Sequence, residues 1–243
     1  MNIRRGTAME KRWKLMEWWT ALWQLFFPPH CAACGAVLVP GEQGLCVKCH
    51  LELPRTDYQK EKDNPTEKLF WGKIRLERAS SHFYYRKSDS FRSVVHQLKY
   101  DNRPDLGLFL GNLMAAELAE SGFFDGIDLL MPVPLHPRKK LKRGYNQSEQ
   151  LARGVAQVTG LPVNTTAVVR RRYTDSQTRK QLHERWQNME GSFSLIRPDE
   201  VAHKHVLLID DVLTTGATLS ACLYVLQEVE GIRLSVLTLG VAG

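Results

Sequence analysis

Two adjacent carboxylates stand where a short apolar run ends and a helix begins. The run covers 206–209, Asp210 and Asp211 follow it, and a turn rich in threonine and glycine leads into apolar residues at helical spacing. The first turn of a helix offers backbone N–H groups that favour a phosphate. An acidic pair directly before a phosphate-binding turn suits a sugar phosphate. The carboxylates would accept hydrogen bonds from the ribose hydroxyls, and the turn would bind the phosphate. The residues predicted to form this site are Asp210, Asp211, Thr214, Thr215, Gly216, Ala217 and Thr218.

The alternative interpretation is that the acidic pair merely caps the following helix. The order of features is much more specific than a lone glycine-rich loop: an apolar run is followed by Asp-Asp, then by Thr-Thr-Gly-Ala-Thr, and then by a helix. Gly216 lets the backbone approach a ligand closely, and the threonine hydroxyls can add hydrogen bonds. The phosphate-site interpretation is therefore favoured.

A proline-bounded basic loop is the second candidate. It begins at Pro134, after a buried strand, and carries the basic residues of 138–143, including Arg138 and Arg143. Prolines fix the loop, the cations supply charge, and Gly144 lets the chain turn into a helix. We expect this loop to face the phosphate turn and hold a pyrophosphate group. The alternative is a basic surface loop with proline punctuation.

Four cysteines have the spacing C-x2-C-x11-C-x2-C, which is typical of a structural zinc site closed by four thiolates. They are Cys31, Cys34, Cys46 and Cys49. The alternative is two disulfides, which is weak because the sequence carries no convincing export signal. A fifth cysteine, Cys222, lies on the apolar face of the helix after the phosphate turn and is predicted to be a buried core residue.

The composition fits a globular protein with a basic surface. Of the 243 residues 43% are hydrophobic and 24% charged, and the net charge is +7. This balance favours polyanions, namely nucleic acid, a pyrophosphate or anionic lipid, without choosing among them. Basic clusters at 138–143 and 170–172 flank the predicted site loops. Residues 18–27 are mostly apolar but too short to span a bilayer. They predict a short helix, packed on the protein or lying on a membrane surface.

Strands alternating with helices predict an α/β fold with a parallel sheet. Ligands bind at the carboxyl ends of such strands, so the Pro-Val-Pro and Asp-Asp ends should face one crevice. The expected strands are 79–85, 129–134, 163–169, 193–196, 206–209 and 234–241, and the expected helices are 91–100, 106–120 and 146–158.

The ordered set of motifs resembles the ComF family of competence-related proteins. It consists of the cysteine pairs after Phe27-Pro28-Pro29, Leu98-Lys99-Tyr100, Pro132-Val133-Pro134, Arg143-Gly144-Tyr145-Asn146-Gln147, and the acidic pair with its turn. The last of these also resembles the phosphoribosyl-pyrophosphate (PRPP) motif of type I phosphoribosyltransferases. Any one motif is moderately specific, but the ordered set is very specific.

The resemblance implies an N-terminal zinc finger joined to a phosphoribosyltransferase-like domain. The resemblance, together with the polar composition and two prolines of 52–73 that indicate a linker, divides the chain into an extension with a short amphipathic helix (1–26), a four-cysteine zinc finger (27–53), a linker (54–78) and the phosphoribosyltransferase-like domain (79–243). It also implies that Lys99 contacts PRPP, that Mg²⁺ accompanies PRPP, and that Gln177, Thr178 and Arg185 lie in a flexible loop over the site. The family is associated with uptake or use of external DNA, including single-strand internalisation in natural transformation.

Two hypotheses from different classes remain open at this point. In the first, the chain is a Mg²⁺-dependent phosphoribosyltransferase in which Asp210 and Asp211 serve catalysis and the acceptor is unidentified. In the second, it is a nucleic-acid-binding module whose zinc finger and basic clusters hold single-stranded DNA through phosphate contacts, with Trp and Tyr side chains available for stacking and PRPP as a regulatory or vestigial ligand. DNA-uptake machinery is an expected partner. The expected location is cytoplasmic, in the bulk phase or at the inner face of the membrane.

Overall fold

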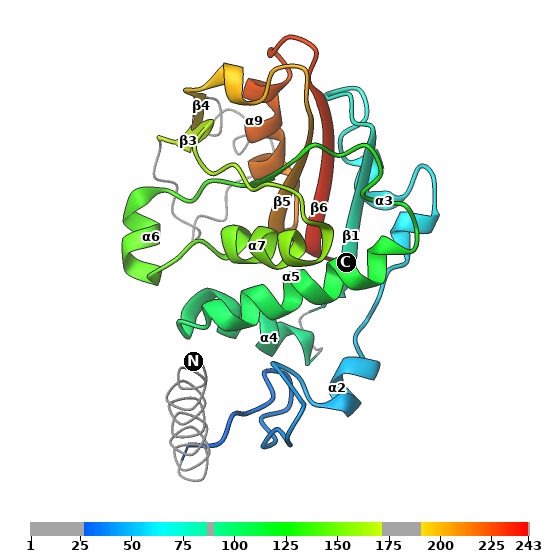
Figure 1. The fold of residues 1–243 in the computed structure, drawn as a ribbon, viewed down its shortest axis with the longest axis vertical. Coiled ribbons are helices and arrows are strands. Elements are labelled where there is room, and N and C mark those ends of the chain that lie inside the picture. Colours follow the sequence, from blue (N-terminus) through cyan, green and yellow to red (C-terminus); the bar gives the residue numbers. More distant parts are fainter. Residues whose placement is uncertain (1–26, 87–89, 172–190, 243) are drawn as a thin grey trace, which may run out of the picture. The chain divides into compact units, whose positions relative to one another are not determined.

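The computed structural model describes residues 27–86, 90–171 and 191–242 (Figure 1). The expectations for 1–26 and for Gln177, Thr178 and Arg185 lie outside these residues. The chain divides after Glu52 into two compact units, which are described separately. In the described residues no helix is long and apolar enough to cross a membrane.

A four-stranded parallel sheet forms the centre of the second unit. Its strands are β1 (Arg78–Tyr85), β2 (Leu129–Pro132), β5 (His205–Leu213) and β6 (Arg233–Ala242), in the order β1-β6-β5-β2. The central pair is in register from His205↔Arg233 to Leu213↔Val241. Both central strands are buried almost throughout, as parallel strands covered on both faces are. The predicted α/β fold with a parallel sheet is confirmed.

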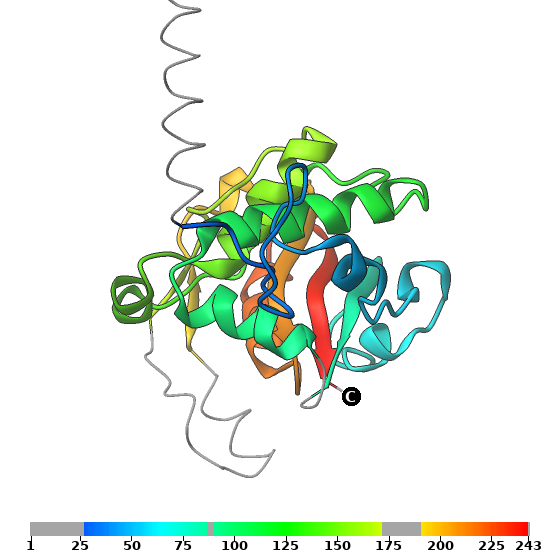
Figure 2. The same ribbon diagram turned by 90° about the horizontal axis from the view of Figure 1, so that it is seen from below.

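One face of the sheet packs against α9 (Ala217–Leu226). Val206 and Leu208 of β5 lie in the same core cluster as Cys222 and Leu223 of α9. Side chains alternate along a strand, so Leu207 and Ile209 point to the opposite face. Cys222 is fully buried, which confirms the prediction of a core residue, and burial raises the pKa of its thiol. Figure 2 shows α9 on the opposite side of the sheet from α5 and α7.

The opposite face is covered by α5 (Pro104–Ala119) and α7 (Gln147–Thr159), which pack closely on one another. Two glycines make this approach possible. A Cβ on Gly111 would lie 2.1 Å from the carbonyl oxygen of Leu151, and one on Gly154 would lie 2.2 Å from that of Leu108. Neither distance can hold a carbon atom, so backbone contacts backbone here. α4 (Phe91–Tyr100) precedes α5 and has the bounds predicted from sequence.

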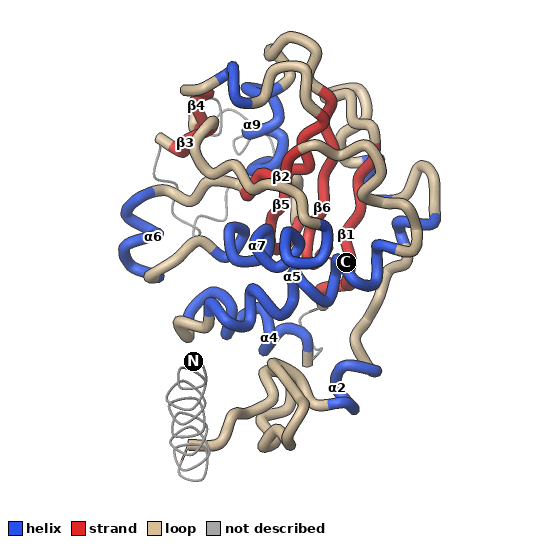
Figure 3. The backbone as a smooth tube through the Cα atoms, viewed as in Figure 1, coloured by secondary structure: helices blue, strands red, loops and turns tan. Residues whose placement is uncertain are grey.

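The sequence analysis predicted one strand over 163–169, and this prediction is wrong. Only Val163 bridges to Leu130 of the main sheet, while β3 (Val168–Arg170) pairs antiparallel with β4 (Phe193–Leu195) in a separate two-stranded sheet (Figure 3). The break follows from Asn164, whose Oδ1 accepts hydrogen bonds from the N–H groups of Thr166 and Ala167. This local turn interrupts the extended backbone.

The segment expected to be a linker packs on the second unit. It contains η1 (Tyr58–Lys60) and α3 (Pro65–Lys68), both in contact with β1. Asn64 caps α3, and its Nδ2 donates to the carbonyl of Ala79 at 2.9 Å. Phe70 is 1% exposed and belongs to the core cluster that includes α9. Polar composition and two prolines therefore concealed buried anchors. The remaining short helices are α2 (Val47–Leu51), α6 (Pro137–Arg143) and η2 (Pro198–Glu200).

Candidate functional site

The acidic pair lies inside β5 rather than after it. The strand continues past the predicted end at Ile209 because Val212 and Leu213 still pair with Gly240 and Val241 of β6. The pairing fixes the backbone of both carboxylates. The turn Thr214–Gly216 follows, and α9 begins at Ala217. The predicted order of strand, acids, turn and helix is thus present, with a strand longer than expected.

Three side chains from other elements hold the pair. Ser148 Oγ donates to Asp210 Oδ1 at 2.8 Å, and Gln147 Nε2 donates to Asp211 Oδ2 at 2.9 Å. Lys99 Nζ lies 3.0 Å from the same Oδ2. The carboxylates are therefore bonded to α4 and α7. Gly216 occupies the N-cap position of α9, where no side chain caps the helix, so the capping interpretation is wrong.

The two carboxyls are electrostatically unequal. Burial, the largest single effect, would raise the pKa of Asp211, but the charge of Lys99 and the hydrogen bonds from the Val212 N–H, Lys99 and Gln147 together lower it. The pKa of Asp210 is raised to about 6 by burial and by the charge of Asp211, against the hydrogen bonds from the Asp211 N–H and from Ser148. Burial, the largest single effect, would lower the pKa of Lys99, but the charge and hydrogen bond of Asp211 and the charge of Asp210 together raise it. Two like charges held side by side titrate apart, as such pairs do.

The turn after the pair has the exposure that a ligand loop needs. Thr214 is exposed, and Thr215 and Thr218 are half-buried. Gly216 has a φ of +74°, in the left-handed region that side chains disfavour. An added Cβ there would meet Leu213 and Phe70 only at ordinary contact distance. The glycine is therefore required by backbone conformation.

Four consecutive residues, Tyr145 to Ser148, join α4, the residue after β2 and the acidic pair of β5. The Tyr145 hydroxyl donates to the carbonyl of Leu98, next to Lys99. Asn146 Nδ2 donates to the carbonyl of Val133 at 3.0 Å, and its Oδ1 caps α7. Gln147 and Ser148 then bond to the acidic pair. We call 145–148 the hub. Its sequence was noted as a motif, but its bonds to Asp210 and Asp211 were not predicted.

The predicted basic loop is partly brought to this site. Arg143 acts electrostatically on Lys99, and its Cζ lies 5.5 Å from the centroid of the Tyr100 ring. Pro134 is half-buried at the end of β2. Arg138 lies exposed on α6, a helix where a loop was expected, and its N–H donates to His136 Nδ1.

Arg170 of the second basic cluster, the last residue of β3, interacts electrostatically with Asp210. Burial lowers the pKa of this guanidinium, and the charge of Asp210 opposes the shift. Its Cζ lies 5.3 Å from the centroid of the Phe193 ring on β4, so the side chain is oriented by the two-stranded sheet. The cluster at 170–172 was noted from sequence, but no site role was predicted for Arg170.

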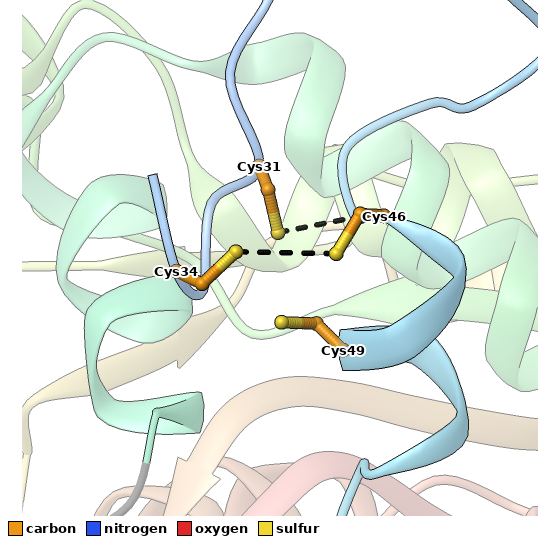
Figure 4. Close-up of side chains that lie close together, drawn as sticks. All are labelled: Cys31, Cys34, Cys46 and Cys49. Atoms are coloured by element: carbon orange, nitrogen blue, oxygen red, sulfur yellow. Dashed lines mark hydrogen bonds between the residues drawn. The ribbon is translucent and has the colours of Figure 1, made fainter. Parts of the chain in front are cut away.

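In the first unit the four predicted cysteines converge (Figure 4). Their sulfur atoms all lie within 4.8 Å of one another, and those of Cys34 and Cys46 are 3.9 Å apart. A tetrahedral zinc with Zn–S bonds of about 2.3 Å places its sulfurs about 3.8 Å apart. The Cys46 N–H donates to Cys31 Sγ at 3.4 Å. All four cysteines are free, against the disulfide alternative, and the set fits a structural zinc ion.

The fold and both sites define a class of protein: a phosphoribosyltransferase-type domain preceded by a zinc ribbon. The model of the phosphoribosyl transferase domain matches residues 141–239, from the end of α6 to β6. The model of the double zinc ribbon domain matches 22–59 and includes the cysteine cluster.

Curated relatives narrow the class further. The DNA utilization protein YhgH of Salmonella typhi is 32% identical over 130 residues, which cover 52% of this chain and 56% of the relative. Competence protein F of Haemophilus influenzae is 28% identical over 131 residues, covering 52% and 57%. The resemblance to the ComF family is thereby confirmed. The chain spans little more than half the length of these relatives.

The similar solved structures are more distant in sequence. A glutamine PRPP amidotransferase from B. subtilis is 21% identical, with 58% of this chain and 30% of that chain covered and a TM-score of 0.39. The adenine phosphoribosyltransferase of Leishmania tarentolae is 13% identical, with 74% and 89% covered and a TM-score of 0.34.

Proposed function

We propose that the chain binds PRPP at the end of β5 and acts in the uptake or use of external DNA. The observation that carries the PRPP proposal is that Asp210 and Asp211 are held by side chains of α4 and α7 directly before an exposed threonine turn. A pair that only capped α9 would bond to that helix instead. The DNA role is supported by the relatives, which are named as a DNA utilization protein and a competence protein.

Each part of PRPP has a matching group. The carboxylates would accept hydrogen bonds from the ribose hydroxyls. Charged acceptors form stronger hydrogen bonds with hydroxyls than neutral acceptors do. The N–H groups at the start of α9, with Thr215 and Thr218, would bind the 5′-phosphate. Lys99 and Arg143 supply positive charge for the pyrophosphate. The hub keeps these groups in place.

The site residues also fit Mg²⁺, because carboxylate oxygens are the ligands that this ion prefers. Asp210 and Asp211 would hold it together with oxygens of PRPP. When bound, the ion would neutralise negative charge on the pyrophosphate group. Lys99 lies 3.0 Å from Asp211, so the chain's own cation already balances part of the carboxylate charge.

Calorimetric titration of PRPP with Mg²⁺ tests the proposal. Asp210→Asn and Asp211→Asn should each weaken binding about tenfold to hundredfold, since a charge-assisted hydrogen bond contributes about 1.5–3 kcal/mol. Thr215→Val should weaken it through loss of a phosphate contact. Asp199→Asn, an equal charge change at an exposed residue of η2, should leave it unchanged. Unchanged affinity in a folded double Asp→Asn variant would refute the PRPP proposal.

A further inference from the structure

Helix α6 has a charge pattern that its own folding does not explain. Five of its seven residues are basic, none is acidic and none is buried. Arg138 and Lys142, like Lys139 and Arg143, stand four residues apart, where like charges destabilise a helix. Lys140 contacts Glu149 at 3.3 Å, but Arg153 contacts the same carboxylate at 2.8 Å. The surface remains strongly positive, and a polyanion laid against it would relieve the repulsion.

An exposed aromatic ring lies beside this helix. Tyr100, the last residue of α4, is 63% exposed, although large aromatic side chains usually bury most of their surface. The Arg143 guanidinium lies 5.5 Å from its ring centroid and the His96 ring lies 4.9 Å from it. These neighbours restrain the ring and leave much of it open to solvent. We call α6 together with Tyr100 the α6 rim.

From this combination we infer that the α6 rim binds single-stranded DNA, with phosphates on α6 and a base stacked on Tyr100. Single strands offer both phosphates and open base faces, whereas a duplex keeps its bases stacked internally. Proteins that bind single strands combine these two features, a basic track and an aromatic platform. An anionic membrane would match the charge but requires an apolar helix face. The only large apolar residue of α6 is Leu141, which is 88% exposed.

The α6 rim is continuous with the acidic pair. Tyr100 directly follows Lys99, whose Nζ lies 3.0 Å from Asp211 Oδ2. The hub bonds the carbonyl of Leu98 through Tyr145, only two residues beyond Arg143. DNA on the α6 rim would therefore lie next to bound PRPP. The inference rests on the proposed DNA role but does not need PRPP to bind, so the two can fail separately.

Fluorescence anisotropy with a labelled oligothymidine tests the inference on the full chain. Tyr100→Ala should weaken binding about fivefold to hundredfold, the range for loss of one stacked base, while Tyr100→Phe should retain most of it. The double variant Lys139→Glu, Lys142→Glu should weaken binding and flatten the dependence of log affinity on log salt by about 1.4, because each phosphate contact on a single strand contributes about 0.7.

The matched control is Lys62→Glu with Arg75→Glu, the same charge change at exposed residues of the segment before β1. Figures 1 and 2 show that segment on the other side of the sheet from α6. The control should leave oligothymidine affinity within about twofold. Calorimetry on Tyr100→Ala, a residue with no assigned PRPP contact, should show unchanged PRPP binding, which separates this inference from the proposed function.

Three results would overturn the inference. α6 rim variants that bind oligothymidine like the control would place DNA elsewhere. If an abasic oligomer bound as tightly as oligothymidine, stacking of a base on Tyr100 would contribute nothing to binding. Vesicles of anionic phosphatidylserine that bind the wild-type chain, lose binding with Lys139→Glu and Lys142→Glu, and outcompete oligothymidine would assign the surface to a membrane.

Discussion

Lys99 and Asp211 form an ion pair with Nζ and Oδ2 3.0 Å apart, joining the last turn of α4 to the acidic end of β5. The pair fixes the charge of one carboxylate and, through it, disfavours ionisation of the other. Asp211 is the lasting anion of the site, and Asp210 is the group whose charge changes in mildly acidic solution.

The ion pair predicts a coupling that unfolding can measure. Lys99→Met leaves the buried Asp211 without its cation and should destabilise the protein by about 3–5 kcal/mol at pH 7.5. Asp211→Asn in the same chain removes the uncompensated charge and should recover much of that loss. Urea unfolding of the two single variants and the double variant gives the coupling energy. Strictly additive effects would mean that the pair contributes nothing to stability.

The raised pKa of Asp210 predicts a pH dependence of stability. The folded pKa of about 6 lies above the unfolded value of about 3.9, so the folded state binds this proton more tightly. The group's stabilising contribution is therefore complete below about pH 4 and is lost as the pH rises through about 6.

Asp210→Asn removes this titration. The free energy of unfolding of the variant, minus that of the wild-type chain, should increase from pH 4 to pH 7. Urea unfolding at several pH values measures the difference, in which groups that do not interact with Asp210 cancel. A difference that is flat across this range would contradict the shift.

The cysteine geometry predicts about one zinc per chain after purification under reducing conditions. Cys46→Ser should lower the zinc content and destabilise the first unit, while the second unit keeps its parallel sheet because the cysteines lie outside it. Metal analysis, together with proteolysis of the two units, measures both effects. A well-folded first unit with four reactive thiols and no metal would contradict a structural zinc.

At Gly111 we expect the usual effect of a Gly→Ala substitution on helix stability to change sign. In an ordinary helix Gly→Ala stabilises by about 1 kcal/mol, but here the new Cβ would lie 2.1 Å from the carbonyl oxygen of Leu151. We expect Gly111→Ala to destabilise by several kcal/mol, because α5 and α7 must separate. Ala116→Gly, at an exposed position of α5, should cost only about 1 kcal/mol. Thermal melts of both variants decide; a stabilised Gly111→Ala would disprove the close contact.

Local patterns in the sequence predicted the elements that they encode. Helix 91–100 has the bounds expected from its apolar spacing, and the parallel sheet follows from alternating strands and helices. The strand over 163–169 was predicted from apolar and β-branched residues. Asn164 turns the chain there through hydrogen bonds of its side chain, which the residue type alone does not reveal. Phe70 looked like part of a linker because its burial depends on contacts with distant residues.

The candidate site likewise contains residues that local sequence patterns predicted and residues whose role depends on distant contacts. Asp210, Asp211 and the turn were predicted because strand, acids and helix start are consecutive in the chain. The role of Gln147 was not predicted from the sequence, because its partner Asp211 is 64 residues away. A polar residue at the start of a helix usually faces solvent. Lys99 was expected at the site from the family resemblance alone, and its ion pair depends on how α4 packs.

The hub also determines which changes of chain length the protein can accept. Each of the four hub residues makes a different bond, and these four consecutive positions contact α4, the residue after β2 and the acidic pair of β5. Inserting or deleting a single residue there would misalign every one of these bonds together, whereas a substitution removes only one. Across evolution or in an engineered library, the hub should therefore vary in residue type far more readily than in length.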